Sequence, residues 1–215
     1  MAVSRAIKSY SEHCYKRSCQ GVWPMNLQTG FSLGSYDMEF SFALAGQNNY
    51  IGGGFINTSA LPDVTEFTNL YDQYRIDKIH MRFGFTNNSS GVNTPTTELP
   101  ILKICTDYDD VGAITSNQIL QYAGMKTFQV GNGGKANDGW YDYWVTPMPQ
   151  VATYRTAIAS GYSRPEKSIK IDTQYNDVPH YGVKLFWDNF GLANAVTVGN
   201  LCIVTTYYLT MFHTK

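Results

Sequence analysis

The chain alternates apolar and polar residues with a period of two in several segments, and this pattern limits its fold more than any other feature. The clearest examples are SYDMEFSFAL (35–44) and the segment 74–86. Successive side chains of a β-strand point to opposite faces of a sheet, so each segment predicts a strand with one face in a core. In the second segment the apolar face carries Ile79, Met81, Phe83 and Phe85, and the other face carries Lys78, His80 and Arg82.

Eight segments of this kind predict an all-β protein with little helix. They are 35–44, 74–86, 101–108, 125–130, 140–149, 168–173, 180–189 and 201–212. Long, irregular connections separate them, whereas an up-and-down barrel uses short hairpin loops. The spacing therefore favours an eight-stranded jelly-roll β-sandwich of two four-stranded antiparallel sheets. Two short helical turns are expected, one capped by Asp63 or Thr65 and one by Thr115 or Ser116.

The charge distribution predicts two regions, an extended N-terminal arm (1–30) and a single jelly-roll domain (31–215). The whole chain carries 16 basic and 17 acidic residues. The first twenty residues are mildly basic, because Arg5, Lys8, Lys16 and Arg17 outnumber Glu12. No apolar run reaches the roughly 18 residues of a membrane-spanning helix, so no membrane insertion is expected.

Motifs for catalysis are missing from the sequence. The four histidines are scattered, and no His-x-His pair offers the metal site of a cupin-like enzyme. No Gly-x-Ser-x-Gly nucleophile elbow is present either. The sequence predicts a protein that is not an enzyme and has no cofactor. A glycoside-cleaving enzyme, which needs two convergent carboxylates, stays an alternative for the structure to test.

Two clusters have both a functional and a structural interpretation. Asp107, Asp109 and Asp110 in TDYDD could bind calcium, but carboxylates that satisfy backbone N–H groups in a turn explain them better. The aromatic residues of GWYDYW (139–144) could form a platform on which sugars or bases stack. Such residues more often fill a core or a subunit interface, which is the favoured interpretation.

Three stretches resemble the capsid proteins of small circular single-stranded DNA viruses, the circovirus-like group that encodes a replication initiator. FTNLYDQYRIDKIHMRF (67–83) looks like the segment that leads into the family's second strand. ILKICTDYDDVGAITSNQILQY (101–122) looks like its third strand with the acidic turn and short helix that follow. HYGVKLFWDN (180–189) looks like its penultimate strand. In order and spacing the resemblance covers about residues 31–213.

The resemblance implies a jelly roll that assembles into an icosahedral shell, with sixty copies expected, around circular single-stranded DNA. The expected partners are further copies of the chain, the genome and a host cell-surface receptor, and the expected locations are the virion and, during assembly, the host nucleus or cytoplasm. In this family's fold the second and seventh strands are neighbours. The segments 74–86 and 180–188 would then form one basic patch of Lys78, His80, Arg82, His180 and Lys184 that meets DNA or the next subunit.

The arm departs from the family pattern, which opens with many arginines. Here the arm offers only Arg5, Lys8, Lys16 and Arg17 for DNA binding. The departure puts genome binding and nuclear import through the arm in doubt, and three alternatives stay open: the patch substitutes for the arm, packaging is weak, or another factor takes part. The alternative function is a lectin-like or receptor-binding jelly-roll module that forms a small oligomer.

Overall fold

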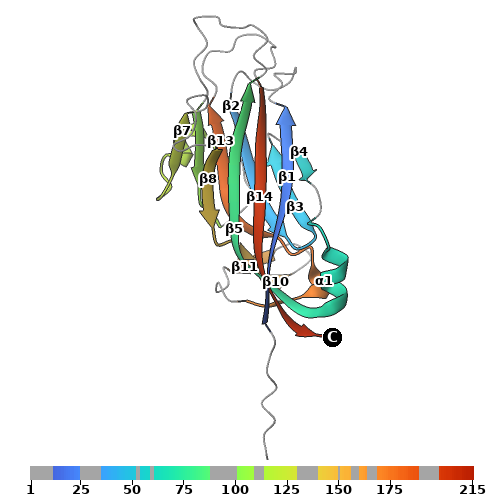
Figure 1. Cartoon of the computed structure of the whole chain (residues 1–215). Coiled ribbons are helices and arrows are strands. Elements are labelled where there is room, and N and C mark those ends of the chain that lie inside the picture. Colours follow the sequence, from blue (N-terminus) through green and yellow to red (C-terminus); the bar gives the residue numbers. More distant parts are fainter. Residues whose placement is uncertain are drawn as a thin grey trace, which may run out of the picture.

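The computed structural model describes residues 12–24, 35–51, 54–58, 61–87, 101–108, 114–129, 140–149, 151–155, 160–163, 169–188 and 199–215. These residues form two antiparallel sheets packed face to face (Figure 1). The chain crosses repeatedly between the sheets, from β1 in the first sheet to β2 in the second and back to β5. The predicted jelly-roll sandwich is confirmed.

Sheet A is the sheet nearer the viewer in Figure 1. Its order is β1–β14–β5–β12, and β8 pairs with the same strand β5 further along its length. The strands are β1 (Glu12–Pro24), β14 (Gly199–Thr214), β5 (Tyr71–Asn87), β12 (Ile171–Asp172) and β8 (Trp140–Val145). The two long strands β5 and β14 form the centre of the sheet.

Sheet B lies behind it and has the order β4–β3–β2–β13–β6–β7, with β9 beside β13. Its strands are β2 (Ser35–Ala43), β3 (Gly46–Ile51), β4 (Gly54–Thr58), β6 (Ile101–Cys105), β7 (Lys126–Gln129), β9 (Met148–Pro149) and β13 (His180–Asp188). A separate hairpin joins β10 (Val151–Arg155) to β11 (Ser160–Ser163). Within the described residues, each sheet therefore has more strand segments than the four that were expected.

The expected boundary after residue 30 is wrong. Strand β1 pairs with β14 over its full length, from Glu12 opposite Phe212 to Pro24 opposite Asn200. Residues 12–24 therefore belong to the sandwich and not to an arm outside it. The sequence of β1 hides this role because an edge strand needs its backbone for pairing but buries few side chains. Residues 1–11 lie outside the described part of the chain.

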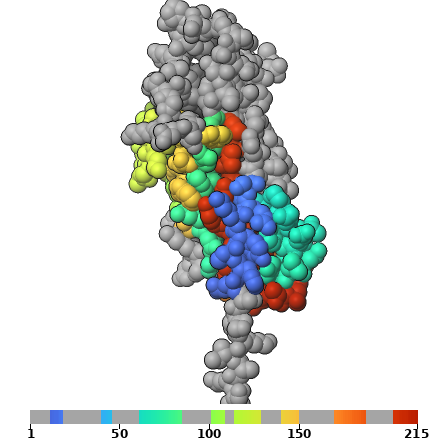
Figure 2. Space-filling view, in the orientation of Figure 1, coloured from blue at the N-terminus to red at the C-terminus, as the bar shows by residue number. Residues whose placement is uncertain are grey.

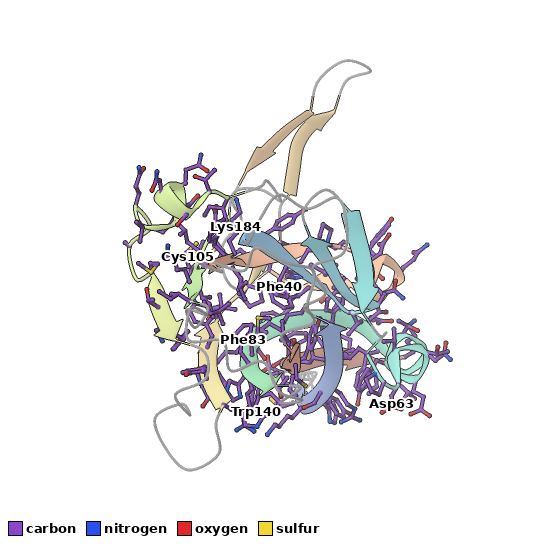
Figure 3. The ribbon with its side chains drawn as sticks, turned by 90° about the horizontal axis from the view of Figure 1, so that it is seen from above. Phe40, Asp63, Phe83, Cys105, Trp140 and Lys184 are labelled. Atoms are coloured by element: carbon purple, nitrogen blue, oxygen red, sulfur yellow. The ribbon has the colours of Figure 1, made fainter. Side chains whose placement is uncertain are left out.

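The core lies between the sheets. Phe40 and Phe42 from β2 meet residues of β5 and β14 such as Phe83 and Tyr207, all with at most 1% of their surface exposed. Seen from above, Phe40 and Phe83 lie between the two layers (Figure 3). Burying apolar side chains is the main favourable term of folding, so these alternating positions hold the two sheets together.

Both predicted helical turns are present. Helix α1 (Val64–Leu70) begins after Asp63, whose backbone is left-handed with a φ of 67°. Helix α2 (Ser116–Ile119) begins after Thr115, which forms a capping box with Gln118. A 3₁₀ helix, η1 (Thr173–Tyr175), precedes β13.

The segment 114–125, which contains α2, covers the outer face of sheet B. Ile114 and Ile119 from this segment pack against Cys105 of β6 and Phe186 of β13, in a cluster separate from the main core. Sheet B is thus buried on both faces in this region. The outer face of sheet A contrasts with it and carries the candidate site.

Candidate functional site

Strand β5 presents its basic side chains on the outer face of sheet A, as its alternation predicts. Ile79, Met81 and Phe83 are buried in the core. On the opposite side of the strand, Lys78 is exposed to solvent, and His80 and Arg82 are partly exposed. The basic face of β5 is therefore an outer surface of the sandwich.

Strand β8 adds two tryptophans beside these basic residues. The register places Trp144 opposite His80, Asp142 opposite Arg82 and Trp140 opposite Gly84. A Cβ atom on Gly84 would lie 2.8 Å from the Trp140 ring, so the glycine lets that indole lie flat on the β5 backbone. Arg82 in turn lies over the Trp140 ring, with its guanidinium carbon 5.2 Å from the centroid.

Trp144 is in contact with two basic side chains at once. The His80 imidazole stacks on it with 3.9 Å between ring centroids and 2° between ring planes. The Lys78 ammonium lies 4.4 Å from the centroid of the Trp144 ring. A cation over an indole face is attracted by the negative face of the ring. Trp144 keeps 44% of its surface exposed despite these contacts.

One carboxylate fixes the position of two of these basic groups. Asp142 Oδ1 lies 2.6 Å from His80 Nε2 and accepts from Arg82 Nε at 3.3 Å. The Asp142 side chain is 50% exposed, so water weakens both interactions. Asp142 therefore orients His80 and Arg82 without removing the positive charge of the surface.

The surface continues across β14 to β1. Tyr208 of β14 packs against Trp144 with 5.6 Å between centroids, and the Lys16 ammonium of β1 lies 5.7 Å from the Tyr208 ring. Figure 2 looks onto this side, where β8, β5, β14 and β1 lie next to one another in gold, green, red and blue. We call this surface the cation–aromatic face, and it consists of Lys16, Lys78, His80, Arg82, Trp140, Asp142, Trp144 and Tyr208.

The chemistry of this face suits an anionic ligand with flat rings. Lys16, Lys78 and Arg82 supply three basic groups, and Asp142 is the one carboxylate among the residues that define the face. Basic side chains neutralise phosphates, and exposed aromatic rings stack on unpaired bases.

Comparison with known proteins identifies the family. The sequence profile described as "Circovirus capsid protein" matches residues 36–211, most of the chain. The chain belongs to the circovirus capsid protein family. No curated protein sequence matches the chain.

Solved capsid structures share the fold of this capsid protein. The BFDV capsid protein in a 60-mer is 16% identical with a TM-score of 0.61, and the match covers 94% of each chain. The same protein in a decamer gives 15% identity and a TM-score of 0.55 over 94% of this chain and 99% of that one. Tobacco necrosis virus gives 12% identity and a TM-score of 0.50 over 95% and 97% of the two chains. The family and the fold assign this protein a structural role in the shell of a virion.

In this capsid protein, His180 does not lie in the predicted basic patch. Strand β13 lies between β2 and β6 in sheet B, while β5 lies in sheet A, so the expectation that the two strands are neighbours is wrong. His180 is 2% exposed, and its Nδ1 lies 2.9 Å from the Val178 carbonyl and 3.1 Å from that of Phe42. Burial lowers the pKa of His180 to about 4, so the ring is neutral near pH 7.

Lys184 is also wrongly placed by the patch prediction. It lies on the outer face of sheet B, beneath the segment 114–125, where its Nζ donates to Asp107 Oδ2 at 2.8 Å. Both side chains are almost completely buried, at 6% and 4% exposure. Figure 3 shows Lys184 and Cys105 on one side of the sandwich and Trp140 on the other. Lys184 therefore cannot share a surface with Lys78.

The same ion pair determines the role of Asp107. Its Oδ2 also accepts from the Tyr122 hydroxyl at 2.7 Å, and this hydrogen bond raises the pKa of Tyr122 to about 12. Asp107 thus joins sheet B to the segment that covers it, which differs from both the calcium and the simple turn interpretation. Asp109 and Asp110 lie outside the described residues. The described ranges contain no group of three or more His, Cys, Asp or Glu arranged to hold a metal ion.

The four basic residues predicted for the arm do not lie together. Lys16 belongs to the cation–aromatic face. Arg17 points to the other side of β1, where its Nε donates to Asp63 at 3.1 Å and its guanidinium lies over the Phe67 ring of α1. Arg17 therefore holds the edge strand to α1. Arg5 and Lys8 lie outside the described residues.

The aromatic half of the cation–aromatic face was not part of the predicted basic patch. For GWYDYW the favoured interpretation was a core or a subunit interface. Tyr143, 3% exposed, lies in the core, whereas Trp144, 44% exposed, lies outside it. Alternation within this segment was the available signal, because positions 140, 142 and 144 share one face of a strand and 143 and 145 share the other. Tyr208 gave no comparable signal, because it lies in a long run of β-branched and aromatic residues.

In the part of the chain that the structure describes, no helix is long and apolar enough to cross a membrane.

Proposed function

We propose that this capsid protein assembles into a sixty-subunit icosahedral shell that packages circular single-stranded DNA. The observation that carries the proposal is the cation–aromatic face, a surface on which two lysines and an arginine lie over aromatic rings. The BFDV capsid protein, which has the same fold, has a solved structure as a 60-mer, and this supports the shell size.

In the assembled shell, the cation–aromatic face points inward to the genome. Single-stranded DNA offers both ligands of such a face, phosphates along the backbone and unpaired bases. Each phosphate that a Lys or Arg neutralises releases a counterion, which gives affinity without sequence preference. A capsid needs this kind of binding because it must hold a whole genome rather than one site.

The opposite side of the sandwich is proposed to face outward. There, the segment 114–125 covers sheet B and buries Lys103 and Lys184, so their charges are shielded from a ligand. A host receptor would meet this side of the shell. Assembly in the host nucleus or cytoplasm is part of the same proposal.

The test is to express the full chain and image the purified product by electron microscopy, with the ratio of absorbance at 260 and 280 nm read on the same fraction. Uniform spherical particles with nucleic-acid absorbance are expected. Lys78→Glu particles should carry less nucleic acid than wild type. The matched control is Lys126→Glu, since Lys126, on β7 of sheet B, is also an exposed lysine whose ammonium lies over an aromatic ring, that of Tyr143.

Two results would contradict the proposal. Equal losses of nucleic acid in the Lys78→Glu and Lys126→Glu particles would show that overall charge matters and the cation–aromatic face does not. A product that stays a small oligomer at every salt concentration and pH would exclude the shell and favour the lectin-like module.

A further inference from the structure

The Trp144 indole is flanked by two different basic side chains. Lys78 and His80 are two positions apart on β5 and point to the same side of the sheet. Two residues of a strand span about 6.6 Å, roughly twice the thickness of an aromatic ring. A ring that stacks on His80 at 3.9 Å and also has the Lys78 ammonium at 4.4 Å therefore fits into the slot between these two side chains.

The two sides of this slot differ in how firmly they are held. The His80 side chain is only 16% exposed, and Asp142 holds its Nε2 at 2.6 Å. Lys78 is exposed. Within the described residues its ammonium contacts the Trp144 ring and forms no ion pair. His80 is thus a fixed wall of the slot, and Lys78 is a movable one.

We propose that Trp144 is a stacking site for an unpaired nucleic-acid base, and that the base takes the place of the Lys78 ammonium on the indole. The inference rests on the proposed function, and it adds the part of the ligand that this position recognises. A stacked base interacts with an indole more strongly than an exposed cation does, so the exchange is favourable. The released ammonium then reaches the phosphate next to the stacked base, where it replaces a counterion.

This mechanism prefers single strands to duplexes. In a duplex both faces of each base are already stacked, and a base must be unpaired and turned out before it can enter the slot. A single strand has no such cost. The face would bind any sequence, because every base offers a flat ring.

Trp140 differs from Trp144 in how much of its ring is open to a ligand. One side of its ring lies against Gly84, where a Cβ would be only 2.8 Å away, and Arg82 lies over the ring at 5.2 Å. Arg82 also donates to Asp142 at 3.3 Å, so it is less free to leave than Lys78. Trp140 is therefore expected to support the face without stacking on a base.

The experiment measures fluorescence anisotropy of the purified full chain with a labelled oligothymidine and with an abasic strand of the same length. The abasic strand keeps the phosphates and lacks the bases. Wild type should bind the oligothymidine about 5- to 150-fold more tightly, the range that corresponds to one stacked base. In Trp144→Leu this ratio should fall to nearly one while the salt dependence of binding stays. In the control Tyr175→Leu, which removes an aromatic ring that is 57% exposed and lies outside the cation–aromatic face, the ratio should be kept.

A second variant tests the exchange without touching the tryptophan. Lys78→Met should weaken binding of the abasic strand and raise the ratio, because no ammonium competes for the ring. A lower ratio in Lys78→Met would mean that Lys78 holds the base, and would overturn the exchange. A ratio that survives in Trp144→Leu would overturn the stacking site while phosphate binding and the proposed function stand. If wild type binds neither strand, both fail.

Discussion

The outer faces of the two sheets use the same residue types for opposite purposes. On sheet A, Lys78 lies in solvent against the exposed ring of Trp144. On sheet B, Lys184 occupies an equivalent outward position, but the segment 114–125 covers it and Asp107 neutralises it at 2.8 Å. Whether a lysine becomes a ligand-binding group or a structural one thus depends on what lies over the strand.

The segment 114–125 also changes the chemistry of another residue that it buries, Cys105 of β6. Burial, and to a lesser degree the charge of Asp107, raises the pKa of the Cys105 thiol to about 12, although Lys184 acts in the opposite direction. The thiol therefore stays protonated and unreactive near neutral pH. Among the residues that the structure describes, no such segment covers Trp144, which keeps 44% of its surface exposed.

Removing the buried carboxylate should have the largest effect on stability. Asp107→Ala leaves the Lys184 ammonium buried without its partner, and breaking a buried ion pair in this way costs about 3–5 kcal/mol. Urea unfolding of the free subunit measures the loss. The control is Asp142→Ala on the exposed face, expected to cost no more than about 1 kcal/mol. Similar losses in the two variants would contradict the contrast between the faces.

Acidification should destabilise the interior between the sheets. The pKa of His180 is about 4 in the folded protein against about 6.5 when unfolded, so the unfolded state binds more protons between these values. The free energy of unfolding should therefore fall as the pH drops from about 6.5 to about 4, by up to about 3 kcal/mol from this residue.

The comparison for this pH effect is His180→Asn, whose amide still donates to a carbonyl but does not titrate. Unfolding by urea over a pH series should give a shallower pH dependence in this variant than in wild type, although both share all other titrating groups. Parallel curves would show that His180 does not set the acid sensitivity.

Adding one methyl group to β5, beneath the cation–aromatic face, should reduce the stability of the protein by less than the loss of Asp107 does. Gly84→Ala places a Cβ 2.8 Å from the Trp140 ring, and such overpacking costs about 1–3 kcal/mol. The double variant Gly84→Ala with Trp140→Leu removes the clash, so its loss of stability should be less than the sum of the two single losses. Additive losses would mean that the indole does not lie on Gly84.

Lys78→Met should have the smallest effect on stability and the clearest effect on binding. An exposed lysine contributes within about 0.5 kcal/mol to folding. For a single strand, the loss of one phosphate contact should reduce the slope of log affinity against log salt by about 0.7. Binding measured over a series of salt concentrations gives the slope. An unchanged slope would mean that Lys78 does not meet a phosphate.

Local alternation predicted the faces of β5 correctly, because the side chains of a strand point to opposite faces whatever strand lies next to it. The wide spacing of the predicted strands indicated the jelly roll, and residue preferences at helix starts indicated a cap at Thr115 or Ser116, of which Thr115 is the cap observed. Alternation did not reveal β1, since Glu12–Pro24 pairs along β14 with little apolar alternation of its own. Strand neighbours depend on contacts far apart in the sequence, so the pairing of β5 with β14 and β8 was not available from a local pattern.

The placement of the basic residues failed for the same reason. Alternation correctly separates Lys184 from Val183 and Leu185, but it does not tell which face another segment will cover. Alternation grouped Lys78, His80 and Arg82 on one face of β5, and the strand neighbours implied by the family resemblance wrongly added Lys184 and His180. The tryptophans were within reach, because Trp140 and Trp144 share one face of β8.

We propose that the cation–aromatic face of sheet A lines the inside of the shell and holds the genome. A cryo-electron microscopy reconstruction of the nucleic-acid-containing particles would show which sheet faces inward. We expect Lys78 and Trp144 on the inner surface, with ordered nucleotide density against the Trp144 ring. A shell in which sheet A faces outward, and the nucleic acid lies against the segment 114–125, would contradict it.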